Sequence, residues 1–70
     1  MYVKCKEGDE QFIVDTEKKE VYKLFEGDAR LIDLSMDNFL RFRPYLKVIK
    51  ETEQAPAEIK EYRASHNASK

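Results

Sequence analysis

The chain has few of the residues that usually reveal an activity or a covalent cross-link. Its 70 residues include one cysteine, one histidine, two glycines, two prolines and no tryptophan. A single cysteine cannot form an intramolecular disulfide and supplies no ligand set for zinc. These absences favour a reducing, cytoplasmic environment, and we expect neither a metal nor another cofactor.

Long apolar runs are missing as well. Residues 1–6 lack the apolar stretch of a secretory signal, and no segment approaches the roughly 18 apolar residues that cross a bilayer. We therefore expect no insertion into a membrane. A folded chain of this size buries only about 60% of the surface that its unfolded form exposes, so its core must be thin.

Candidate catalytic residues are scarce. His66 lies in a polar tail, where a general base or metal ligand lacks rigid support. Cys5 lies in a predicted strand whose neighbours Lys4 and Lys6 point to the opposite face, so we expect a buried, unreactive thiol. The two glycines are far apart and fit turns better than a phosphate-binding loop. The sequence therefore predicts a protein that is not an enzyme.

The residues that are present alternate between apolar and polar, as is typical of short strands. This period predicts strands at 2–6, about 10–15 and about 20–25. Glycine turns follow the first and the third of these, and a polar reversal follows the second. Residues 30–34 form either a fourth strand or an extended segment. Strands joined this tightly form an antiparallel meander.

At Ser35 the period changes to that of a helix. Ser35 is a good N-cap, Asp37 suits the helix N-terminus, and three apolar residues share one face: Met36, Phe39 and Leu40. Pro44 disfavours helical geometry at the residue before it, which limits this helix to about 35–43. The segment 44–51 remains open between a closing strand and a second helix that starts at Pro44.

The fold class that these patterns predict is α+β. We expect a small antiparallel meander of three to five short strands with one short helix, in a single domain at 1–51. Residues 52–70 read as a polar tail, with a frayed helix at 55–64 followed by disorder. One core is expected between sheet and helix, formed by Val3, Phe12, Val14, Leu24, Leu31, Leu34, Phe39, Leu40, Leu46 and Val48.

One segment combines positive charge with aromatic residues. Residues 38–50 contain four basic residues and no acid. Aromatic and arginine side chains carry much of the binding energy at protein interfaces, and unstacked bases also rest on them. The candidate partner-binding residues are therefore Arg41, Phe42, Arg43, Tyr45 and Lys47. In the alternative interpretation, Phe42 and Tyr45 fold back onto the thin core.

These observations support three hypotheses of function. In the first, the chain is a small intracellular module that binds another protein as a non-catalytic regulator or inhibitor, through this segment and an adjoining sheet edge. Its size, initiator Met1 and charged end are typical of bacterial and phage accessory proteins. In the second, residues 39–50 bind single-stranded nucleic acid. In the third, an exposed edge strand or the stripe of Ile59 and Tyr62 forms a homo-oligomer.

Overall fold

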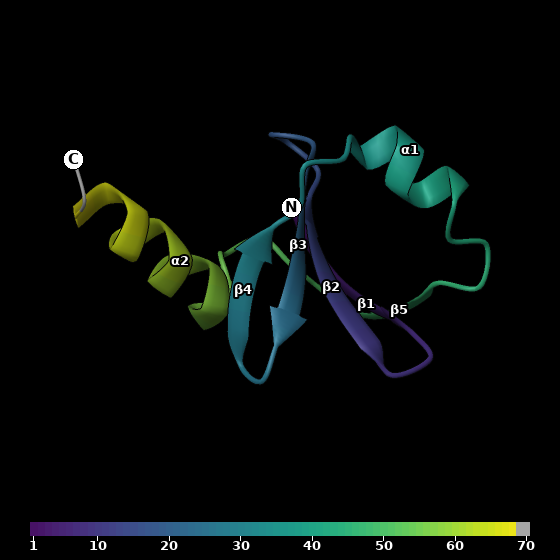
Figure 1. Cartoon of the computed structure of the whole chain (residues 1–70), viewed down its shortest axis with the longest axis horizontal. Helices are drawn as coiled ribbons and strands as arrows, with labels where there is room; N and C mark the ends of the chain where they lie inside the picture. The colour runs from purple at the N-terminus through teal and green to yellow at the C-terminus, as the bar shows by residue number, and fades with distance from the viewer. Residues whose placement is uncertain (69–70) are drawn as a thin grey trace.

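One antiparallel sheet with a helix on each face organises the chain. The computed structural model describes residues 1–68, and the side chains of residues 1–65. Its elements are β1 (Tyr2–Glu7), β2 (Glu10–Asp15), β3 (Glu20–Phe25), β4 (Asp28–Leu31), α1 (Met36–Arg41), β5 (Lys47–Thr52) and α2 (Ala57–Ala68). The strands lie in the order β4-β3-β2-β1-β5, with the helices at opposite sides of the sheet (Figure 1). The predicted α+β class is confirmed.

The first four strands form the expected meander, and their turns follow from local chemistry. Gly8 and Gly27 adopt φ angles of 62° and 91°, which a side chain would make unfavourable. Between β2 and β3, the Asp15 carboxylate accepts hydrogen bonds from the backbone N–H groups of Glu17 and Lys18, at 3.1 and 3.2 Å. A short acidic side chain thus fixes the turn that the sequence places there.

The segment that the sequence left open is a strand. β5 pairs antiparallel with β1, so the chain crosses from one edge of the sheet to the other by way of α1. The register places Lys47 opposite Lys6 and Lys50 opposite Lys4, and it shifts between Lys4 and Cys5. This shift is typical of a β-bulge, in which one strand contributes an extra residue.

α1 begins and ends where the sequence indicates. The Ser35 hydroxyl accepts a hydrogen bond from the backbone N–H of Asn38 at 3.2 Å, which satisfies one donor of the first turn. Phe39 is buried and meets Phe12 edge to face, with ring centroids 4.9 Å apart. The core on this face of the sheet consists of Cys5, Phe12, Val14, Val21 and Phe39.

The prediction of a single core is wrong, because the other face of the sheet has a core of its own. Its buried residues are Ile13, Tyr22, Ala29 and Ile59. Successive residues of β2 point to opposite faces, and helices cover both of them, so Phe12, Ile13 and Val14 are all buried. Leu24 packs against this second core, whereas four residues predicted in the core are exposed: Leu31, Leu34, Leu40 and Val48.

The second core depends on α2, which packs beside β4 (Figure 1). Ile59 has no exposed surface, and Tyr62 meets Tyr22 edge to face at 5.4 Å. Part of the segment that composition set aside as a tail therefore belongs to the packed structure. The predicted helix at 55–64 occurs at Ala57–Ala68, so the disorder expected after residue 64 is wrong for 65–68, where the helix continues. Residues 69–70 lie outside the described residues.

Polar contacts complete the docking of α2. Arg63 donates one hydrogen bond to the Tyr2 hydroxyl at 2.7 Å and another to the Asp15 carboxylate at 2.9 Å. The Tyr22 hydroxyl donates to Glu20 at 2.9 Å. Hydrogen bonding to Tyr2 raises the pKa of Arg63 above the ordinary value of an arginine. Burial raises the pKa of Tyr22 to about 12. α2 is thus held by the buried side chain of Ile59 and by the two hydrogen bonds of Arg63.

Candidate partner-binding surface

Residues 42–46 join α1 to β5, and we name this segment the aromatic loop. It extends beyond the end of the sheet, on the side away from α2 (Figure 1). Phe42 is 69% exposed and Tyr45 is 80% exposed. Neither aromatic side chain folds back onto the core, so the surface interpretation of these two residues agrees with their positions.

Arg43 holds the aromatic loop in place. Its guanidinium donates to the Glu7 carboxylate at 2.9 Å and lies 3.9 Å from that of Glu10. The same group lies over the rings of Phe12 and Phe39, 4.8 and 5.7 Å from their centroids. Arginine is suited to this combination because its planar guanidinium stacks on rings while it donates at its edge.

Backbone contacts restrict the aromatic loop further. The Arg43 N–H donates to the Leu40 carbonyl at 3.4 Å, and the Leu46 N–H donates to the Arg43 carbonyl at 3.3 Å. Leu46 also packs against the first core. The backbone between these anchors is therefore ordered before any partner arrives, although Phe42 and Tyr45 point into solvent.

The remaining predicted residues occupy different positions. Arg41 is exposed in the last turn of α1, and Lys47 is exposed at the first position of β5. The structure thus brings Arg41, Phe42 and Tyr45 to one end of the molecule and directs the Arg43 guanidinium inward. A direct contact of any of these residues with a partner stays a prediction.

Apolar side chains extend this surface along the edge of the sheet. β5 is the outermost strand on this side, so the backbone groups on its outer edge have no neighbouring strand. Val48 and Ile49 of β5 are 63% and 49% exposed, and Leu40 at the end of α1 is exposed too. Several large apolar side chains thus face solvent between α1 and β5.

A second feature of this region escaped the sequence analysis. Lys4, Lys6, Lys47 and Lys50 lie on the same face of the paired strands β1 and β5, and we name this group the lysine face. Lys4 and Lys6 are two residues apart, which is a signal in the sequence. The contribution of β5 could not be seen until its pairing with β1 was known.

Of the two candidate catalytic residues, the structure describes the side chain of Cys5. Cys5 is buried in the first core, its thiol directed at the Phe12 carbonyl at 3.8 Å, and burial raises its pKa to about 11. Among the described residues, no group of three His, Cys, Asp or Glu side chains is arranged to hold a metal ion. The side chain of His66 lies outside the described set.

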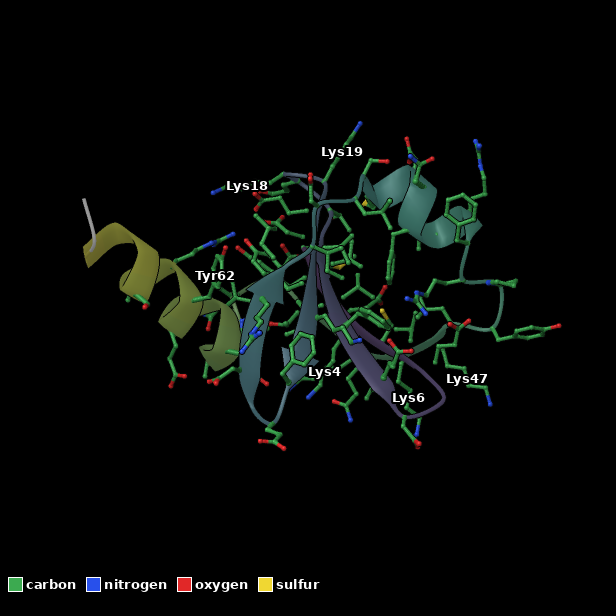
Figure 2. The ribbon with its side chains drawn as sticks, in the orientation of Figure 1. Lys4, Lys6, Lys18, Lys19, Lys47 and Tyr62 are labelled. Carbon is green, nitrogen blue, oxygen red and sulfur yellow. The ribbon has the colours of Figure 1, made fainter. Side chains whose placement is uncertain are left out.

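A hollow of about 580 Å³ lies on the other side of the molecule, between β4 and α2. Its lining mixes both signs of charge, with Asp28, Arg30, Glu58 and Glu61 around Tyr62. Tyr62 lies beside β4 (Figure 2), where it belongs to the packing of α2. The packing of α2 against β4 therefore accounts for this hollow, and we do not assign a ligand to it.

Comparisons with protein-family models, with curated proteins and with solved structures found no match. Within residues 1–68, neither helix has the length and apolar character needed to cross a membrane.

Proposed function

We propose that this protein is a small, non-catalytic module that binds another protein and acts as its regulator or inhibitor. The binding surface comprises the aromatic loop, Arg41 and the adjoining edge of β5. The buried free thiol of Cys5 suits a reducing compartment, which supports a site of action inside the cell.

The observation that carries this proposal is the exposure of Phe42 and Tyr45 on a loop that is otherwise anchored. When a partner covers two large aromatic side chains that were exposed to water, the free energy of the complex is lowered. Because Arg43 and the loop hydrogen bonds already fix the backbone, little ordering entropy is lost on binding. Exposed aromatics on a preorganised support are typical of interface anchors.

The alternative, a single-stranded nucleic-acid interface, is supported less well. Arg43 already pairs with Glu7 and stacks on the core, so a phosphate would have to compete with the Glu7 carboxylate for its guanidinium. The apolar side chains of Leu40, Val48 and Ile49 enlarge the surface without adding groups that contact phosphates or bases. They fit a protein partner better.

Affinity capture with matched variants tests the proposal. We expect Phe42→Ala and Tyr45→Ala each to weaken binding of the purified partner by about 2 kcal/mol, the usual effect of losing an interface anchor. Phe25→Ala is the control, because Phe25 is also a surface aromatic but lies in β3, which β2 and β1 separate from β5.

Each outcome of this experiment has a distinct meaning. Capture is run with and without nuclease, and each variant is checked first by circular dichroism. Equal binding by wild type, Phe42→Ala and Tyr45→Ala would refute the proposed surface. Loss of the captured material on nuclease treatment, with an affinity for oligonucleotides that falls steeply with salt, would favour the nucleic-acid alternative.

A further inference from the structure

The two faces of the sheet differ in how far their basic residues are paired with carboxylates. On the face covered by α1, Arg43 pairs with Glu7 at 2.9 Å, and Lys23 pairs with Glu10 at 3.0 Å. The hydrogen bond from Lys23 lowers the pKa of Glu10. Lys23 and Arg43 on this face thus each have a carboxylate partner, whereas Arg30, which lies opposite Lys23, has none among the ion pairs of the described side chains.

The lysine face, on the opposite side of β1 and β5, has no such balance. Lys4 lies directly across from Lys50, and Lys6 lies directly across from Lys47. Among the side chains that the structure describes, no carboxylate lies within 4.0 Å of any of these four ammonium groups. Like charges directly opposite on neighbouring strands are destabilising, so this arrangement weakens the sheet.

This part of the sheet is also open to a ligand. α2 packs mainly beside β4, at the other end of the same face, and reaches β1 through Arg63 at Tyr2. Lys4 is half-buried, and the other three lysines of the lysine face are exposed. Lys4, Lys6 and Lys47 lie together along the lower part of Figure 2, whereas Lys18 and Lys19 extend from the hairpin tip at the top. A pocket of about 310 Å³ is lined by Lys4 and Lys50 together with Glu58 of α2 and other residues.

We infer that the lysine face binds the acidic side chains of an extended segment from the partner protein, which adds as a strand to the free edge of β5. This inference rests on the proposed function and specifies the chemistry of the partner. In an added strand, alternate side chains point to opposite faces, so carboxylates would reach Lys47 and Lys50 while apolar residues reach Val48.

A peptide fits these observations better than a nucleic acid does. The backbone edge of β5 offers N–H and C=O groups that only another polypeptide backbone matches in register. Tyr2 is the aromatic residue of β1 on this face, but it packs against the second core and accepts a hydrogen bond from Arg63, so its ring is not a free platform for base stacking. The exposed aromatics lie on the aromatic loop, which runs directly into β5.

The test uses a fluorescent peptide of alternating glutamate and valine, with binding followed by anisotropy at low ionic strength. We expect the double variant Lys6→Gln/Lys47→Gln to weaken binding about tenfold, because two of four facing charges are lost. Lys18→Gln/Lys19→Gln removes the same charge from the hairpin tip and is expected to change binding less than about twofold. An N-methylated version of the peptide is expected to lose binding, because it cannot pair with β5.

The stability of the lysine variant gives a second measurement. Relief of like-charge repulsion is expected to leave Tm unchanged or to raise it by about 1–2 °C. A fall in Tm of several degrees would show that these lysines stabilise the fold, and would overturn the inference.

Other results would overturn it as well. These are an absence of peptide binding, an equal effect of the two lysine pairs, or tighter binding of oligothymidylate that is lost in Lys6→Gln/Lys47→Gln. If Phe42→Ala loses the cellular partner while the lysine variant keeps it, the proposed function stands and this inference fails. If the lysine variant alone loses both the peptide and the partner, the role of the aromatic loop fails instead.

Discussion

Replacement of Arg63 by alanine tests whether α2 is an integral part of the fold. Arg63 joins the C-terminal helix to the first two strands, through Tyr2 in β1 and Asp15 at the end of β2. The side chain of Asp15 is only 3% exposed, whereas that of Arg63 is 29% exposed. The variant therefore leaves a buried carboxylate without its only cationic partner among the described side chains.

The size of the effect follows from what remains at Asp15. Loss of one member of a fully buried ion pair costs about 3–5 kcal/mol. Here the turn still donates two backbone hydrogen bonds to one carboxylate oxygen, and the partial exposure of Arg63 lets water reach the other. We therefore expect a loss near that of one charged hydrogen bond, about 2–3 kcal/mol.

Such a loss is large for a chain of this length. A domain of 70 residues has a free energy of unfolding of about 4–10 kcal/mol, and each kcal/mol shifts Tm by about 4–8 °C. Thermal and urea unfolding followed by circular dichroism would measure the change. Lys60→Ala is the control, because Lys60 is exposed on the same helix and none of the identified ion pairs includes it.

A double-mutant cycle with Asp15→Asn isolates the pair from the other contacts of Arg63. The amide oxygen of asparagine can still accept from the turn, so the cycle should report a coupling energy of about 1–3 kcal/mol between the two side chains. If Arg63→Ala is no more destabilising than Lys60→Ala, the hydrogen bonds of Arg63 to Tyr2 and Asp15 contribute nothing to the free energy of unfolding. In that case α2 docks through Ile59 and Tyr62 alone.

Three further predictions concern the cores and the aromatic loop. Ile59→Ala should lower the free energy of unfolding by about 2–5 kcal/mol, because it leaves a cavity in the second core; an unchanged urea midpoint would contradict this. Because folding raises the pKa of Cys5 from 9.0 to about 11, ionisation favours the unfolded chain. This contribution to stability is complete below pH 9 and is lost by pH 11, about 2–3 kcal/mol in all. Stability measured across that range should therefore fall less steeply for Cys5→Ala, and a thiol reagent that modifies the native wild type at neutral pH would refute the burial. Arg43→Ala should destabilise the fold by about 1–3 kcal/mol and weaken partner binding as well, since it removes the support of the aromatic loop. Arg41→Ala is the comparison for stability alone, because Arg41 is exposed and is expected to leave the free energy of unfolding unchanged.

The sequence predicted the local elements well because short-range signals determine them. Period-two alternation located β1, β2 and β3, and the Ser35 cap with Pro44 bounded α1. The pattern failed where the environment depends on distant residues. Leu31 and Val48 are apolar and lie in strands, yet each belongs to an edge strand that no helix fully covers, so both are exposed.

The second core was missed for the same reason, because a segment that is mostly polar in sequence packs against the sheet. The stripe of Ile59 and Tyr62 was visible, but its polar surroundings favoured a frayed tail. What holds α2 is a fully buried isoleucine and an arginine whose partners lie 48 and 61 residues earlier in the chain. Propensity does not report such contacts, because tertiary packing supplies most of the stability of a short helix.

The candidate binding surface was predictable only in part, for the same physical reason. Exposed aromatics could be proposed from the clustering of Phe42 and Tyr45 with basic residues, but Arg43 carries the same charge as Arg41 and faces inward. Its role depends on Glu7, which is 36 residues away. Likewise, the lysine face exists only because β5 returns to pair with β1.

The distribution of charge connects stability to the proposed binding. On the α1 side, Lys23 and Arg43 are paired with carboxylates, although Arg30 lies opposite Lys23 without an ion pair among the described side chains. On the other side, two pairs of lysines repel each other across adjacent strands, although an acidic residue at Lys47 or Lys50 would relieve that repulsion with no change of fold. Lysines also protect an open edge from aggregation, but Lys47 and Lys50 on β5 suffice for that purpose. Lys4 and Lys6 lie on β1, an interior strand with no edge to protect, so edge protection accounts for Lys47 and Lys50 alone, whereas Lys4 and Lys6 add to the positive field that an acidic segment at β5 would meet.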